Sequence, residues 1–170
     1  MFESRGFNLF MAFACHQLLI AAFYFQYVEG MEPCPFCIFQ RIAVLAIGIW
    51  FLLHGIHKPL AGSRWNTFYN IAGLLSAMIG TLISARHAYL QSLPADEVPA
   101  CGPSLDYLVD MLPIMEVLEV VFKGSGSCAV VSWRMLGLSM PMWLMLFFVG
   151  CLGLLGWRLY RHFRPNNNIF

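Results

Sequence analysis

The stretch Pro33-Cys34-Pro35-Phe36-Cys37-Ile38-Phe39-Gln40-Arg41 leads from a short polar segment into a long apolar one. It holds two cysteines in CxxC spacing and an arginine four residues after the second. The apolar run that follows, to about His54, approaches the ~20 residues with which a helix crosses a bilayer. A dithiol at a membrane surface beside a fixed positive charge suits electron transfer between aqueous thiols and a lipid-soluble acceptor.

The composition of the whole chain agrees with membrane embedding. Of the 170 residues, 59% are hydrophobic and 11% charged, far from the roughly 25% charged residues of soluble domains. Because backbone hydrogen bonds must close internally in lipid, the apolar stretches are expected to be helices. We therefore predict an all-α membrane protein, a bundle of four transmembrane helices in a single integral membrane domain over residues 1–170. The predicted spans are approximately 8–28, 37–54, 67–86 and 140–159.

The distribution of basic residues predicts the orientation of the chain. Lysines and arginines near the ends of spans concentrate in cytoplasmic segments. One side of the predicted bundle carries Arg5, Lys58, Arg64, Arg158, Arg161 and Arg164, and a single acid, Glu3. The other side carries Glu29, Glu32, Asp96, Glu97, Asp106, Asp110, Glu116 and Glu119. Both termini are thus expected in the cytoplasm, with two outward loops at about 29–36 and 91–139. A net charge of +1 gives no indication of nucleic-acid binding.

The long second loop has internal structure in its sequence. Apolar residues recur at helical spacing between Leu105 and Val121, interrupted by Pro113. This pattern predicts short amphipathic helix, either on the membrane surface or packed on the bundle. The segment Gly124-Ser125-Gly126-Ser127 is expected to be a flexible hinge leading to Cys128.

The predicted topology sorts the six cysteines. Cys15 and Cys151 fall within spans and are expected to be small buried packing residues. The remaining four, Cys34, Cys37, Cys101 and Cys128, fall on the outward side. Four thiols on the oxidising side of a membrane favour two disulfides, either structural or redox-active. No metal site is expected, because structural zinc usually uses two close cysteine pairs, whereas Cys101 and Cys128 are far apart in sequence.

Three features of the first pair favour a redox role over a structural one. In CxxC spacing one thiol can resolve a mixed disulfide formed by the other. Cys37 is expected in the first turn of span two, where unpaired N–H groups favour a thiolate. Arg41 lies on the same helix face one turn on, although an interfacial arginine can also simply reach the headgroups. His87, at the outer end of span three, is equally compatible with an ordinary interfacial histidine.

These motifs together resemble the DsbB family of bacterial disulfide-forming membrane proteins. The resemblance rests on four spans, the segment Cys37-Ile38-Phe39-Gln40-Arg41, an outward cysteine pair in the second loop, and the passage from Gly126-Ser127-Cys128 through Trp133 to Leu136–Leu144. It extends over essentially the whole chain. Cys15 and Cys151 lie outside the family's pattern.

The resemblance implies a role for each candidate residue. Cys34 and Cys37 match the pair that passes electrons to quinone, and Arg41 and His87 match residues near the quinone. Cys101 matches the cysteine attacked by a DsbA-like periplasmic thiol oxidoreductase, and Cys128 is its mate. The implied activity is that of a protein-dithiol:quinone oxidoreductase, using diffusible ubiquinone or menaquinone. The implied location is the bacterial inner membrane, with the redox cysteines on the periplasmic side.

Two other functional classes are compatible with parts of the sequence. One is a quinone-type reductase resembling vitamin K epoxide reductase, which also uses a four-helix bundle. In that family the CxxC lies late in the chain, whereas here it opens span two. The other is a non-catalytic membrane scaffold with structural disulfides, in which loss of Cys34 would lower stability without affecting redox flux.

Overall fold

The computed structural model describes residues 4–60, 63–94, 110–111, 113, 115–116, 126–129, 131 and 133–164. Its long helices are α1 (Arg5–Tyr27), α2 (Pro35–His57), α3 (Arg64–Ser92) and α7 (Met140–Phe163). Each of the four is long and apolar enough to cross a membrane. The chain is therefore a multi-pass membrane protein with the expected four-helix architecture.

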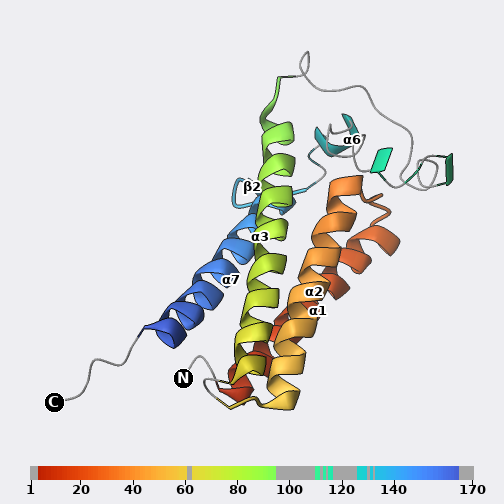
Figure 1. Ribbon diagram of the computed structural model, residues 1–170. Helices are drawn as coiled ribbons and strands as arrows, with labels where there is room; N and C mark the ends of the chain where they lie inside the picture. Colours follow the sequence, from red (N-terminus) through yellow and green to blue (C-terminus); the bar gives the residue numbers. More distant parts are fainter. Residues whose placement is uncertain are drawn as a thin grey trace.

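The helices pack in chain order, α1 on α2, α2 on α3 and α3 on α7 (Figure 1). The start of α1 and the end of α7 lie at one end of the bundle, and the start of α2 lies at the other. The one-turn helix α6 (Gly126–Ala129) sits beside this second end and packs on α3. A short hairpin of β1 (Arg134–Met135) and β2 (Leu138–Ser139) leads directly into α7.

Three helices, α1, α2 and α3, begin two or three residues before the predicted spans because local capping extends them, whereas α7 begins at Met140, as predicted. Ser4 and Ser63 accept hydrogen bonds from backbone N–H groups in the first turns of α1 and α3. Cys34 does the same for α2 through its sulfur, and Pro35 occupies the first turn, where its missing N–H costs nothing. The redox motif is thus also the signal that starts this helix.

Close helix contacts in the middle of the bundle depend on small residues. A methyl group at Gly80 of α3 would lie 2.6 Å from the ring of Phe148 on α7, and one at Gly48 of α2 would lie 3.0 Å from Cys15 on α1. Cys15 and Cys151 are buried in this core, as predicted for packing residues. Many large apolar side chains on the outer faces are exposed, as expected of surfaces that meet lipid.

A buried polar chain joins all four helices near the end where α1 begins. Arg158 Nη1 of α7 donates to Asn8 Oδ1 of α1 at 2.9 Å, and Asn8 Nδ2 lies 2.8 Å from His54 Nδ1 of α2. His54 Nε2 lies 2.7 Å from Asn66 Oδ1 of α3. Because the Asn8 oxygen already accepts from Arg158, its amide group donates to Nδ1, so His54 carries its proton on Nε2. The network fixes the relative positions of the helices by directional bonds.

The second outward loop was predicted to contain an amphipathic helix and a flexible hinge before Cys128. Most of the predicted amphipathic helix between Leu105 and Val121 lies outside the described residues, as does Cys101. The predicted hinge before Cys128 differs from the structure in its last two residues, because Gly126–Ala129 forms a helical turn. Cys128 is buried against the bundle, and this tertiary contact compensates for the low helix propensity of the glycine and serine.

Candidate redox site

The CxxC pair lies at the start of α2, where capping holds the two sulfurs together. Cys34 is the N-cap and Cys37 stands in the first turn, with its backbone N–H 3.4 Å from the Cys34 sulfur. The Cys34 thiol donates to the Cys37 sulfur at 3.0 Å. Cys34 is buried, and Cys37 is partly accessible. The Cys37 sulfur, which is the more accessible of the two, therefore accepts the hydrogen bond between the thiols. This bond favours the thiolate form of Cys37.

Two other elements cover Cys34. His87 of α3 places Nε2 3.7 Å from the Cys34 sulfur, and its ring stacks on Phe36 with centroids 5.8 Å apart. From α6, the Cys128 thiol also contacts the Cys34 thiol. The hydrogen bonds with Cys128 and Cys37, together with burial, raise the pKa of the Cys34 thiol well above its usual range. Cys34 is therefore held as a protonated thiol between two other cysteines.

Arg41 is held by α1 rather than by its own helix. Its guanidinium donates through Nη1 to Gln26 Oε1 and through Nη2 to the Ala22 carbonyl oxygen at 3.1 Å. It also lies 5.4 Å from the centre of the Phe23 ring. All three partners are uncharged, so none of them offsets the positive charge of Arg41, which lies one turn from Cys37 along α2.

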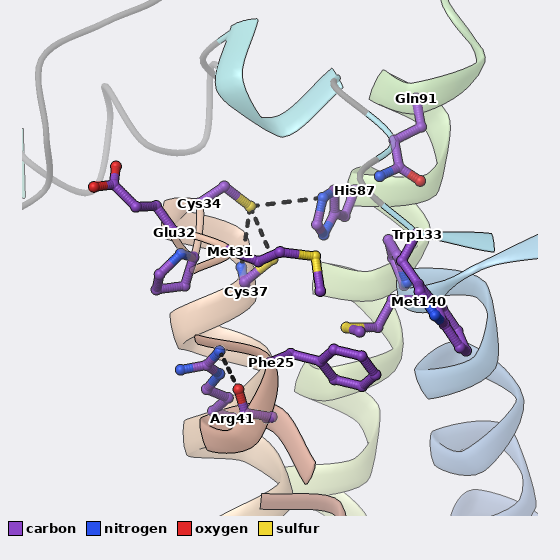
Figure 2. Close-up of a pocket in the computed structure, with 13 residues that line it drawn as sticks. Phe25, Met31, Glu32, Cys34, Cys37, Arg41, His87, Gln91, Trp133 and Met140 are labelled. Atoms are coloured by element: carbon purple, nitrogen blue, oxygen red, sulfur yellow. Dashed lines mark hydrogen bonds between the residues drawn. The ribbon is translucent and has the colours of Figure 1, made fainter. Parts of the chain in front are cut away.

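A pocket with about 590 Å³ of empty space, including its open mouth, joins the dithiol to Arg41 (Figure 2). Cys34, Cys37, Arg41 and His87 all line it. Its other walls are largely apolar, formed among others by Phe25, Met31, Trp133, Met140 and Pro141. An apolar pocket with a few convergent polar groups is the usual form of a small-molecule site. A ligand with a flat apolar ring and a polar oxygen fits this lining, with the ring against the apolar wall and the oxygen near Arg41.

The structure thus brings together five of the six candidate residues from the sequence, and Cys101 lies outside the described part of the chain. Sequence reasoning missed Gln26, Phe25, Trp133 and Met140 as site residues. Gln26 had no comparable signal in the sequence, because it lies one residue before the end of α1 whereas Arg41 lies six residues after the start of α2, and the two meet only through the packing of these helices. Trp133 was noted only as part of a motif, and it reaches the pocket through contact with Phe25, ring centroids 5.7 Å apart.

Comparison with known proteins identifies the family. The model of the family described as "Disulfide bond formation protein DsbB" matches residues 4–158. The chain belongs to the DsbB family. Proteins named "Disulfide bond formation protein B" are similar to it over most of their length. That of Nitrosococcus oceani is 49% identical over 138 residues, covering 81% of this chain and 80% of the relative. That of Saccharophagus degradans is 44% identical over 144 residues, covering 85% and 86% respectively.

A third relative extends the match further along the chain. The Disulfide bond formation protein B of Xanthomonas axonopodis pv. citri is 44% identical over 151 residues, 89% of this chain and 86% of the relative. Membership of the DsbB family confirms the resemblance drawn from the CxxC segment and the passage into span four. It also makes the chain a disulfide-forming membrane oxidoreductase, the activity that the family's name describes.

Proposed function

We propose that this DsbB-family protein re-oxidises a periplasmic, DsbA-like thioredoxin-fold dithiol oxidase and passes the electrons to membrane quinone. The observation that carries the proposal is the pocket in which Cys37, Arg41 and an apolar wall converge at the outer end of α2. The dithiol borders this pocket through Cys34 and Cys37, and Cys34 also contacts Cys128. It therefore has both an electron donor and an acceptor site within reach.

Electrons enter through the second loop. A thiolate of the reduced partner attacks the Cys101 sulfur of a Cys101–Cys128 disulfide, forming a mixed disulfide and releasing Cys128 as a thiolate. The partner's second thiol then attacks its own half of the mixed disulfide, leaves as an oxidised pair and releases Cys101. In this route the reduced Cys101 and Cys128 then exchange with the Cys34–Cys37 disulfide, which restores the Cys101–Cys128 disulfide and leaves Cys34 and Cys37 reduced. In a second route, the Cys128 thiolate first attacks Cys34 in its disulfide with Cys37, joining the loops and releasing the Cys37 thiolate. After the partner has left, the Cys101 thiolate attacks Cys128, restores the Cys101–Cys128 disulfide and releases Cys34. The contact between Cys128 and Cys34 supports this second route.

Electrons leave through Cys37. When quinone occupies the pocket it supplies a two-electron acceptor, which takes up two electrons and two protons per disulfide formed. The chain's contribution is to present the Cys37 sulfur and to stabilise negative charge near the Arg41 guanidinium. Cys34 and Cys37 are left as a disulfide, ready for the next transfer. Exchange among thiols alone would stall, because a DsbA-like partner is itself a strong oxidant. Removal of electrons into the lipid phase makes the sequence of steps run forward.

The proposed orientation places this site on the periplasmic side of the bacterial inner membrane. The helix ends that carry the basic residues lie together at the opposite end of the bundle, which supports cytoplasmic termini under the positive-inside rule (Figure 1). The proposed spans and outward loops are those given by the sequence, with 29–36 and 91–139 in the periplasm.

The division of labour between the loops can be tested with Cys101→Ser. In this variant we expect the reduced partner to remain reduced, since its point of attack is missing, while the Cys34–Cys37 pair still cycles with a small dithiol and quinone. Alkylation of the partner's free thiols over time would measure oxidation of the partner. Quinone absorbance would measure cycling of the Cys34–Cys37 pair. Normal oxidation of the partner by Cys101→Ser would show that electrons enter elsewhere.

A further inference from the structure

The dithiol has a third potential ligand beside it that the cysteine pattern alone does not reveal. The sulfurs of Cys34 and Cys37 and Nε2 of His87 all lie within 4.8 Å of one another. The individual distances are 3.0 Å between the sulfurs and 3.7 Å from the Cys34 sulfur to Nε2. Figure 2 shows the His87 ring directed at this pair from the neighbouring helix.

We propose that the reduced protein binds a thiophilic divalent ion, Zn²⁺ or Cd²⁺, at Cys34, Cys37 and His87. Two thiolates and an imidazole form a ligand set that d¹⁰ ions favour. With metal–sulfur bonds of about 2.3 Å and metal–nitrogen bonds of about 2.0 Å, tetrahedral ligands stand roughly 3.5–3.8 Å apart. The distance between Cys34 and His87 already has this value. The sulfurs must separate by less than 1 Å, and Cys37 borders open pocket space into which it can move.

The surroundings allow an ion to enter and to complete its coordination. Glu32 lines the same pocket and is exposed, so a carboxylate stands at the entrance. A fourth ligand is available either from water in the pocket or from the Cys128 thiol, which contacts Cys34. With water as the fourth ligand, the protein provides three ligands and an open position, whereas structural zinc sites are closed by four protein ligands.

Binding is restricted to one redox state. The two thiols lose two protons to solvent as two metal–sulfur bonds form, whereas a Cys34–Cys37 disulfide has no thiolate to offer. The ion therefore stabilises the reduced dithiol and withholds its electron pairs from an acceptor. Metal binding stands independently of the proposed quinone reaction, and only the resulting arrest of turnover rests on it.

The test is a Cd²⁺ titration of the full-length protein in detergent, reduced with a phosphine under anaerobic conditions. Sulfur-to-cadmium charge-transfer absorption reports thiolate ligation, and calorimetry gives affinity and stoichiometry. Cys101→Ser serves as the background, so that the second cysteine pair cannot chelate an ion by itself. We expect one ion per chain in the reduced protein, and loss of the absorption band after oxidation. His87→Ala should weaken binding at least about tenfold, as changes around a metal centre commonly do.

The control and a second measurement keep the result interpretable. Cys151→Ala removes a buried thiol outside the cluster and should leave Cd²⁺ affinity unchanged. In the unmutated protein, bound Cd²⁺ should protect Cys34 and Cys37 from alkylation, as read by peptide mass spectrometry. Equal affinity in the oxidised protein, unchanged affinity in folded His87→Ala, or full alkylation of both cysteines with Cd²⁺ present would each overturn the proposal. Failure of quinone reduction would leave these readouts unaffected.

Discussion

The way in which α1 holds Arg41 leads to a specific prediction for Gln26. The Gln26 amide oxygen accepts from one guanidinium nitrogen of Arg41, and the Ala22 carbonyl accepts from the other. Gln26→Ala removes the first contact and leaves the second. Because the side-chain hydrogen bond of Gln26 is to Arg41, the substitution should affect the position of the positive charge and leave the dithiol intact.

The expected size follows from the number of bonds lost. A hydrogen bond to a charged group contributes roughly 1.5–3 kcal/mol. Arg41 keeps the Ala22 carbonyl and the Phe23 ring, so we take the lower end of this range for the loss of positioning. Since about 1.4 kcal/mol corresponds to a factor of ten in rate, kcat/KM for quinone should fall about tenfold.

The assay is steady-state quinone reduction, together with a separate measurement of thiol exchange with the reduced partner. Gln26→Ala should slow the first and leave the second unchanged. Gln17→Ala, the same substitution at an exposed position of the same helix, is the matched control and should behave like the unmutated protein. A Gln26→Ala variant with normal kcat/KM for quinone would refute the positioning role.

Gln26→Glu separates geometry from charge. The carboxylate can accept the same hydrogen bond, but it pairs with Arg41 and cancels the charge available to a developing oxyanion. We expect quinone reduction to fall at least as far as in Gln26→Ala. If Gln26→Glu were as active as the unmutated protein, the hydrogen bond alone would matter and the argument from an uncompensated cation would be wrong.

Two further predictions concern the stability of the bundle, measured as thermal unfolding in detergent. Gly80→Ala should destabilise the folded protein by about 1–3 kcal/mol, since its methyl group would overlap the Phe148 ring. The control is Gly150→Ala, which has nothing within 4 Å of the added carbon and should be neutral or slightly stabilising. Equal melting temperatures for the two variants would contradict this packing. Asn8→Ala should cost about 1–3 kcal/mol, because it removes both the acceptor for Arg158 and the donor to His54, and an unchanged melting temperature would show that the buried network contributes little.

Much of the fold could be predicted from the sequence because lipid restricts the possibilities. Apolar stretches of sufficient length must be helices, and the CxxC segment carries its own helix start in Cys34 and Pro35. The candidate pocket was predictable as far as it depends on local spacing, which puts Arg41 one turn from Cys37. Contacts between helices were not predictable in the same way. The approach of His87 to Cys34 and of Gln26 to Arg41 depends on the rotation of neighbouring helices, which is set by packing of side chains along their whole length.

The buried polar residues also depend on contacts between helices that the sequence does not reveal. In the sequence, His54 marked the end of the second apolar run and Arg158 belonged to the basic side of the predicted bundle, yet each is buried in the network that joins the four helices, together with Asn66. No short motif marks them, because their partners come from different helices.

The most direct test of the central claim is anaerobic quinone reduction by the purified protein. The protein would receive a reduced periplasmic thioredoxin-fold donor and either ubiquinone or menaquinone, and would be compared with its Cys34→Ser variant. The proposed route predicts turnover that is lost in Cys34→Ser while the variant remains folded. Absence of turnover with both quinones in the folded unmutated protein, or equal turnover in Cys34→Ser, would contradict electron transfer from this dithiol to quinone.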